Sequence, residues 1–193
     1  PKKEPVMKYI FLNLKRFDIP KELGGVNSIA PISQWGGYIS EKLDKGLGVY
    51  KNEDVEFAGF FPEAHIIPAV SALSENIFKI GCQSVINADT AVGGNFGAFT
   101  TGRTGNAMKA LGCDYTIIGH CEERNSLLSV LNLAGSSDKK LVHKRLNEQI
   151  KAAQKAGLKV LYCIGETMEE QDQWETVLKD QIEIGLDGVD MSG

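Results

Sequence analysis

The sequence predicts an α/β protein whose strands form a parallel sheet. Five short apolar runs recur along the 193 residues, and segments with helical periodicity separate them. The apolar runs are continuous rather than alternating, which is typical of strands buried on both faces of a sheet. Strands and helices in regular succession favour βαβ units, in which consecutive strands run parallel.

The apolar runs and the periodic segments give the predicted elements in chain order. The strands are predicted at Tyr9–Leu14, Val55–Phe61, Phe78–Val85, Tyr115–Ile118 and Lys159–Ile164. The helices are predicted at Ile32–Leu43, Ala64–Leu73, Lys140–Ala156 and Glu169–Ile184.

The clearest helix is the third of these. Its apolar residues recur at spacings of three to five, which places them on one stripe, and Lys and Glu occupy the other positions. The stripe is predicted to contain Leu141, Leu146, Ile150 and Ala153. Gly157 follows as a helix stop before the last strand.

Two connections are longer than a compact α/β domain needs. Asn87–Gly105 is rich in Gly and Thr, and Asn125–Ser137 separates the fourth strand from its helix. We predict that both are loops, and loops of this length usually carry function or form an interface.

Composition excludes several classes of protein. The formal charge is −4, with 42% hydrophobic and 24% charged residues, which predicts one globular domain over residues 1–193. An acidic balance argues against binding to nucleic acid or to an anionic membrane surface. No apolar run reaches the roughly 18–20 residues of a membrane span, and none resembles a signal peptide. We therefore expect a cytoplasmic protein with four reduced cysteines.

Polar residues follow three of the predicted strands, where the reactive groups of parallel α/β folds collect. Asn13 and Lys15 follow the first strand, His120 and Glu122 the fourth, and Glu166 the fifth. From the pattern alone, Lys15 is either a solvated lysine or an anchor for an anionic substrate. His120 is either a packed histidine or a catalytic one, and Glu122 could simply stabilise a helix start.

Other chemistries find less support. His120-Cys121-Glu122 matches half of a zinc deaminase signature, but the P-C-x-x-C half is absent. Neither a phosphate-binding P-loop nor a dinucleotide-binding G-x-G-x-x-G follows any strand. We therefore expect no metal and no nucleotide cofactor.

Five motifs, in order along the chain, resemble those of one family. Tyr115–Arg124 (YTIIGHCEER) is similar to an apolar strand followed by G-H-S-E-R-R, and Val160–Glu166 ends in C-I-G-E. Asn13–Lys15 (NLK) resembles N-W-K, Gly97–Thr100 (GAFT) resembles the tip of a long third loop, and Gln83 follows the third strand. Together these motifs resemble the triosephosphate isomerase family.

The resemblance implies a (β/α)₈ barrel, of which about five of the eight βα units are present. It also implies interconversion of dihydroxyacetone phosphate and glyceraldehyde 3-phosphate through an enediolate, in glycolysis and gluconeogenesis, without metal or organic cofactor. A homodimer is implied as well, formed through the Asn87–Gly105 loop with Phe99 and Thr100 at the contact.

The motifs assign roles to individual residues by resemblance. His120 would be a neutral electrophile that polarises the substrate carbonyl. Lys15 would counter the charge of the phosphate and of the developing oxyanion, and Asn13 would help to position the substrate. Glu122 would be a supporting carboxylate.

The chain departs from the family pattern at several positions. Cys121 replaces a Ser, Glu123 replaces an Arg, and Leu14 replaces a Trp. Asn125–Ser137 is longer than usual, and a Glu that the family has there finds no evident counterpart. These changes leave two alternatives: an isomerase of another short sugar phosphate, such as a tetrulose phosphate, or a binding or assembly paralogue without catalysis.

The family's Y-E-P-V-W stretch, which carries the glutamate base, is not found in the 193 residues. A general base contributes about 10²–10⁴-fold in rate, so we expect these residues alone to be catalytically inert. With only five strands, Tyr9–Leu14 and Lys159–Ile164 should be open edges.

Overall fold

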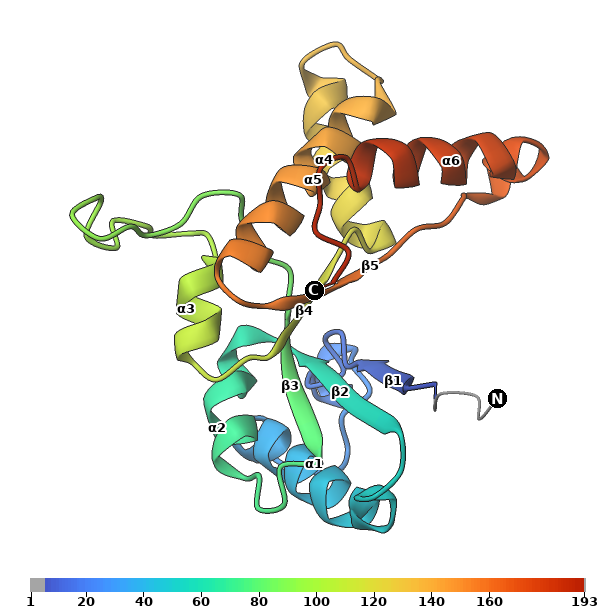
Figure 1. The fold of residues 1–193 in the computed structure, drawn as a ribbon. Helices are drawn as coiled ribbons and strands as arrows, with labels where there is room; N and C mark the ends of the chain where they lie inside the picture. Colours follow the sequence, from blue (N-terminus) through green and yellow to red (C-terminus); the bar gives the residue numbers. More distant parts are fainter. Residues whose placement is uncertain (1–5, 193) are drawn as a thin grey trace, which may run out of the picture. The chain divides into compact units, whose positions relative to one another are not determined.

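The computed structural model describes residues 6–192, which contain five strands and six α-helices (Figure 1). The strands are hydrogen-bonded in the order β1-β2-β3-β4-β5, so each lies next to the strand that precedes it in sequence. By their contacts the residues form two compact units. Unit 1 comprises residues up to Gln83 together with Met108–Tyr115; unit 2 comprises Ser84–Ala107 together with residues from Thr116 onward.

Unit 1 is built on three parallel strands. They are β1 (Lys8–Asn13), β2 (Val55–Phe61) and β3 (Phe78–Gln83), with α1 (Ile32–Gly46) and α2 (Ile66–Ser71) between them. In register, Phe11 of β1 lies opposite Ala58 of β2, which lies opposite Lys79 of β3. The predicted parallel arrangement is confirmed.

The core of unit 1 gathers around β2. Ala58, Phe60 and Phe61 are fully buried there, and the Trp35 side chain of α1 meets the Phe61 ring edge-on. The continuous apolar run of β2 therefore packs on both faces, as its sequence predicts.

The first strand is an edge. Its pairing within residues 6–192 is with β2, and Tyr9 and Ile10 are each 55% exposed. The expectation of an open strand at this end of the sheet is confirmed for β1. Since β5 stands last in the strand order, it is the other edge.

Unit 2 holds the other elements. They are α3 (Gly105–Ala110), β4 (Tyr115–Ile118), α4 (Cys121–Leu133), α5 (Lys139–Lys155), β5 (Lys159–Tyr162) and α6 (Trp174–Gly185), with α3 and β4 beginning or ending in unit 1. The N–H of Cys163 donates to the carbonyl of Ile118 at 2.8 Å and links the ends of β5 and β4. Short 3₁₀ helices occupy Lys21–Leu23, Leu47–Tyr50, Glu63–His65 and Met168–Gln173.

The buried stripe of α5 differs from its prediction at one position. Leu146, Ile150 and Ala153 are buried as expected, but Leu141 is 40% exposed and Val142 is buried in its place. Because a helix turns 100° per residue, a residue five positions before Leu146 lies well off the stripe, whereas one four positions before it lies on the stripe.

The predicted loop at Asn125–Ser137 is wrong for most of its length. Helix α4 runs through it from Cys121 to Leu133, and only the last residues form a turn. The reason is visible in the helix itself, since none of its residues is buried. An exposed helix has no sustained apolar face to generate the periodicity on which the prediction depends.

Candidate active site

In unit 1, the residues after β1 form a loop around Lys15. The backbone of this lysine has φ of +44°, in the left-handed region that L-residues other than Gly seldom adopt. The Lys15 N–H donates to Asn13 Oδ1 at 3.0 Å, and the Lys15 carbonyl accepts from Gln83 Nε2 at 3.0 Å. The same amide nitrogen donates to the carbonyl of Phe60 at 3.2 Å.

These bonds fix the conformation of Lys15. A left-handed residue with a Cβ costs about 1–2 kcal/mol, and such strain persists where the surroundings determine it. Here Asn13 holds the N–H of Lys15, and Gln83 holds its carbonyl. The two predicted residues Asn13 and Lys15 therefore lie together, and Gln83 supplies the third part of the arrangement.

In unit 2, Gly119 ends β4 and turns the chain toward His120. Its φ is +84°, and a Cβ there would lie 2.9 Å from the carbonyl oxygen of Cys163 and 2.9 Å from the ring of Tyr162. Glycine is required at this position both by the left-handed backbone and by the close approach. The turn leaves His120 as the residue that precedes α4.

Two side chains from the first turn of α4 hold the peptide groups of Gly119. The Gly119 N–H donates to Glu123 Oε2 at 2.7 Å, and its carbonyl accepts from Arg124 Nε at 2.7 Å. Arg124 also donates from Nη2 to the carbonyl of Cys163 at 2.6 Å. The turn before His120 is thereby fixed on both sides and tied to the end of β5.

His120 contacts the two residues that follow it. Its Nδ1 lies 3.1 Å from Glu122 Oε2 and 3.5 Å from the sulfur of Cys121. The side chain of His120 is 26% exposed and that of Glu122 is 69% exposed. The predicted residues His120 and Glu122 are thus brought together, with the thiol of Cys121 beside them.

A third held peptide follows β5. The Gly165 N–H donates to Gln181 Oε1 at 3.0 Å, and Gln181 Nε2 donates back to the Gly165 carbonyl at 2.8 Å. Gln181 is buried on α6. Glu166, the polar residue predicted after this strand, is exposed next to the held glycine.

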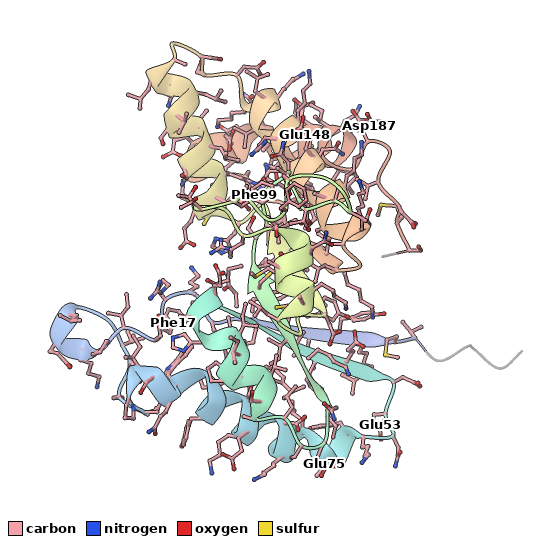
Figure 2. All side chains as sticks on the ribbon, turned by 90° about the vertical axis from the view of Figure 1, so that its left-hand side faces the viewer. Phe17, Glu53, Glu75, Phe99, Glu148 and Asp187 are labelled. Atoms are coloured by element: carbon pink, nitrogen blue, oxygen red, sulfur yellow. The ribbon has the colours of Figure 1, made fainter. Side chains whose placement is uncertain are left out.

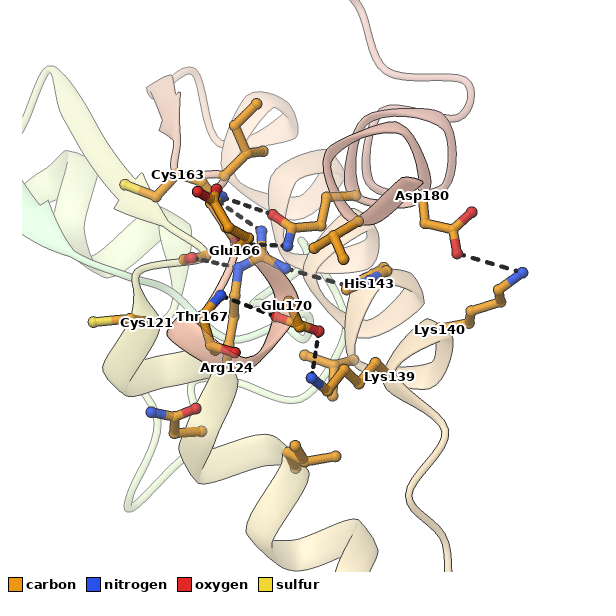
Figure 3. A pocket seen from close by; sticks show the side chains of 18 of the residues that line it. Cys121, Arg124, Lys139, Lys140, His143, Cys163, Glu166, Thr167, Glu170 and Asp180 are labelled. Atoms are coloured by element: carbon orange, nitrogen blue, oxygen red, sulfur yellow. Dashed lines mark hydrogen bonds and ion pairs between the residues drawn. The ribbon is translucent and has the colours of Figure 1, made fainter. Parts of the chain in front are cut away.

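Unit 2 contains a cavity of about 580 Å³ (Figure 3). His120 is one of the residues that line it. Its other walls come from the end of β5 and from helices α4, α5 and α6. The cavity carries opposite charges in pairs, Lys139 with Glu170 and Lys140 with Asp180. Its charged groups are therefore largely compensated.

Arg124 also fixes the proton of a histidine in the cavity wall. Its Nη1 lies 3.2 Å from Nδ1 of His143, and because a guanidinium only donates, Nδ1 accepts and the ring proton sits on Nε2. Burial, followed by the nearby charge of Arg124, lowers the pKa of His143 below its usual value. His143 is thus a neutral, packed histidine.

The long loop Asn87–Gly105, whose Phe99 is labelled in Figure 2, belongs to unit 2 and is held at its base by hydrogen bonds. The Ile86 N–H donates to the Arg103 carbonyl at 2.8 Å, and Asn87 Nδ2 donates to Glu148 Oε2 at 2.7 Å. Toward the tip, Thr100 is exposed, Phe99 is half-buried and Phe96 is 95% exposed. Phe96 is the most exposed aromatic side chain of the loop, and the motif comparison did not select it.

Comparisons with known proteins show to which family the chain belongs. A family model described as triosephosphate isomerase matches residues 39–193. The chain belongs to the triosephosphate isomerase family. It is 35% identical over 143 residues to the triosephosphate isomerase of Geobacter metallireducens and 32% identical over 154 residues to that of Alkaliphilus metalliredigens. These alignments cover 73% and 79% of this chain, and 50% and 53% of the relatives.

The chain therefore spans about half the length of the curated relatives it matches. The crystal structure of triosephosphate isomerase from Bartonella henselae superposes with a TM-score of 0.64 at 21% identity, over 93% of this chain and 62% of that one. The fold is accordingly an α/β partial barrel with five of the eight βα units of a (β/α)₈ barrel.

Residues 6–192 give no indication of two other kinds of site. No group of three or more His, Cys, Asp or Glu side chains among them is arranged to hold a metal ion. None of their helices has both the length and the apolar character needed to cross a membrane.

Proposed function

We propose that the protein to which this chain belongs interconverts dihydroxyacetone phosphate and glyceraldehyde 3-phosphate. Family membership supports this reaction class, because the relatives are triosephosphate isomerases. The observation that carries the proposal is the setting of His120. It follows a strand end, on a glycine turn held from both sides, with most of its side chain buried against a cavity wall.

In this proposal His120 is the electrophile that polarises the substrate carbonyl as the enediolate develops. Its present contact with Glu122 has a consequence for the ring. A carboxylate only accepts hydrogen bonds, so the 3.1 Å contact requires the proton on Nδ1, and a neutral ring then presents a lone pair at Nε2. To donate from Nε2 while neutral, His120 has to be released at Nδ1 by Glu122.

That release is inexpensive. Glu122 is 69% exposed, and an exposed ion pair contributes only about 0–1 kcal/mol. In this contact Glu122, the proposed supporting carboxylate, sets which nitrogen of His120 carries the proton until substrate binds. Substrate binding, by placing a carbonyl oxygen near Nε2, would favour the other tautomer.

Lys15 is proposed to counter the charge of the phosphate and of the oxyanion. Its left-handed backbone, held by Asn13 and Gln83, gives the start of its side chain one direction. Asn13 is then a residue that orients Lys15 as well as one that helps to position the substrate. Association as a homodimer through Asn87–Gly105, with Phe99 and Thr100 at the contact, completes the proposal.

The test is an isomerase assay on two preparations with confirmed intact masses: the 193 residues alone and the product of the complete gene. We expect no turnover from the 193 residues, because the glutamate base is missing from them, and measurable turnover from the gene product. His120→Gln in the gene product should lower kcat by about 10²–10⁴-fold. Near-normal turnover by the 193 residues, or an inactive gene product, would contradict the proposal.

One observation favours a second candidate, an isomerase of another short sugar phosphate. Asn125, Leu128 and Ser137 of the unusually long segment line the same cavity as His120. Turnover of a tetrulose phosphate above that of the triose phosphates by the gene product would select this alternative.

A further inference from the structure

We propose that Glu123 is a positioning residue for His120, a role that rests on the proposed function and adds a residue to its site. The carboxylate of Glu123 is half-buried and accepts from three donors. Gly119 N–H donates to Oε2 at 2.7 Å, Gln149 Nε2 donates to Oε1 at 3.0 Å, and the hydroxyl of Ser84 donates to the same oxygen.

The first of these contacts acts directly on the turn that presents His120. Gly119 immediately precedes His120, and its left-handed backbone has to be kept in one orientation. Glu123 is the third residue of α4, where a carboxylate can reach back toward the backbone before the helix and is favoured by the helix dipole. Together with Arg124 on the carbonyl side, Glu123 sets the direction of the peptide that leads into His120.

The other two contacts join this turn to the base of the long loop. Ser84 has φ of +68°, and its carbonyl accepts from Arg103 Nε at 3.2 Å. Gln149 also donates to the carbonyl of Val85 at 2.7 Å. Glu123 thus lies between Ser84, which precedes the long loop, and the turn before His120, all within unit 2.

The surroundings of Glu123 are suited to an acid and unsuited to the arginine that the family motif has at this position. A guanidinium only donates, and two of the three partners, the Gly119 N–H and the Gln149 amide nitrogen, are donors as well. At position 123 this chain therefore has a hydrogen-bond acceptor with three donors around it, where the family motif has a donor.

The experiment compares Glu123→Gln and Glu123→Arg with Glu175→Gln. Glu175 is also an acid in the first turn of a unit 2 helix, but it is exposed and lies outside the cavity wall. Two readouts are used: kcat and KM of the complete gene product, and the imidazole NMR signals of the 193-residue chain. The chain has three histidines, so the His120 signals can be assigned with His120→Gln.

With Glu123→Gln, kcat should fall by about 10- to 100-fold while KM stays within about 2-fold, as expected for a small misplacement of a reacting group. The His120 signals should shift or broaden, those of His65 should stay unchanged, and Glu123→Arg should have the larger effect. Glu175→Gln should change neither readout. Gln149→Met removes one donor and retains the carboxylate, so it should shift the same signals less, even if the Glu123 variants do not fold.

Unchanged His120 signals in both the Glu123 and Gln149 variants would overturn the role, and so would a fall in kcat without any change at His120. An inactive wild-type gene product would count against the proposed reaction only. The NMR comparison would then still decide whether Glu123 orients His120.

Discussion

The loop after β1 offers the sharpest test of how the site is held in place. Replacing Gln83 with Glu exchanges a donor for an acceptor opposite two carbonyl oxygens, those of Lys15 and Phe60, at 3.0 and 3.2 Å. Each neutral hydrogen bond contributes about 0.5–1.5 kcal/mol, so losing both costs about 1–3 kcal/mol. Oxygen facing oxygen adds repulsion, and we expect unit 1 to lose about 3 kcal/mol or more of its free energy of unfolding.

Urea unfolding followed by Trp35 fluorescence measures this loss. Trp35 is buried in unit 1, and a Trp174→Phe background removes the other tryptophan. Gln83→Met, which removes the bonds without the repulsion, should lose about 2 kcal/mol. Gln34→Glu makes the same chemical change at an exposed position of α1 and should stay within about 0.5 kcal/mol of the wild type.

The loss of stability in Gln83→Glu should depend on pH. A carboxylate facing oxygens has a folded-state pKa above its unfolded value, so the penalty of Gln83→Glu is complete above the folded pKa and fades as the pH falls. The backbone NMR signals of Lys15 should move in the same variant. Wild-type stability of Gln83→Glu at neutral pH, or an unchanged Lys15, would refute the argument that Gln83 holds this backbone.

Two further predictions concern stability. Asp44 is fully buried and accepts hydrogen bonds from the five backbone N–H groups of residues 74–78. Asp44→Asn should therefore lower the free energy of unfolding, measured in urea, by about 3 kcal/mol or more. The control Glu53→Gln, at an exposed acid, should change it almost not at all. Burial alone would raise the pKa of Asp44, but the backbone donors, that of Phe78 first, outweigh burial and leave the pKa below its usual value. The stability that the Asp44 carboxylate contributes is therefore present above about pH 4 and is lost as the pH falls below it. This loss should occur in the wild type and not in Asp44→Asn. Gly157→Ala should lower the free energy of unfolding by about 1 kcal/mol, and Gly119→Ala should lower it by more. Both glycines have positive φ, but only at Gly119 would a Cβ meet neighbouring atoms. Equal losses would refute the close approach at Gly119.

Strand and helix positions were largely predictable, because burial leaves a periodic record in the sequence. All five strands and the stripe of α5 after its first turn follow from it. Helix α4 did not, because a helix with no buried residue leaves no such record. Phe96 was missed for a related reason: exposure of a loop side chain depends on the path of the loop, which periodicity does not describe.

The candidate site could be predicted from the sequence as a set of residue types but not as a set of contacts. The sequence could select the polar residues that directly follow an apolar run, because the reactive groups of parallel α/β folds collect at strand ends. These residues are His120, Glu122, Asn13 and Lys15. Glu123 could be noticed only as a departure from the motif, and its three donors come from positions 119, 84 and 149. Ser84 and Gln149 are distant from Glu123 in sequence, so the packing of elements brings them together and no local pattern reports them.

Three strand ends, one in unit 1 and two in unit 2, share one construction. After β1, β4 and β5, a single residue has both its N–H and its carbonyl held by side chains: Lys15 by Asn13 and Gln83, Gly119 by Glu123 and Arg124, and Gly165 by Gln181. Beyond the end of a strand, backbone N–H and carbonyl groups no longer have a hydrogen-bond partner on the neighbouring strand. Leaving such a group buried and unpaired costs about 1–3 kcal/mol. Side-chain clamps satisfy these groups and fix the direction of the next residue at the same time.

This construction makes each clamp independent of the other unit. The clamps after β4 and β5 lie wholly within unit 2, and the clamp after β1 lies within unit 1, so none depends on residues outside its own unit. The backbone at Lys15 and the backbone that leads into His120 are therefore held by contacts within their own units. Variants in the clamps should accordingly change the backbone geometry at these two residues in the 193-residue chain as well as in the product of the complete gene.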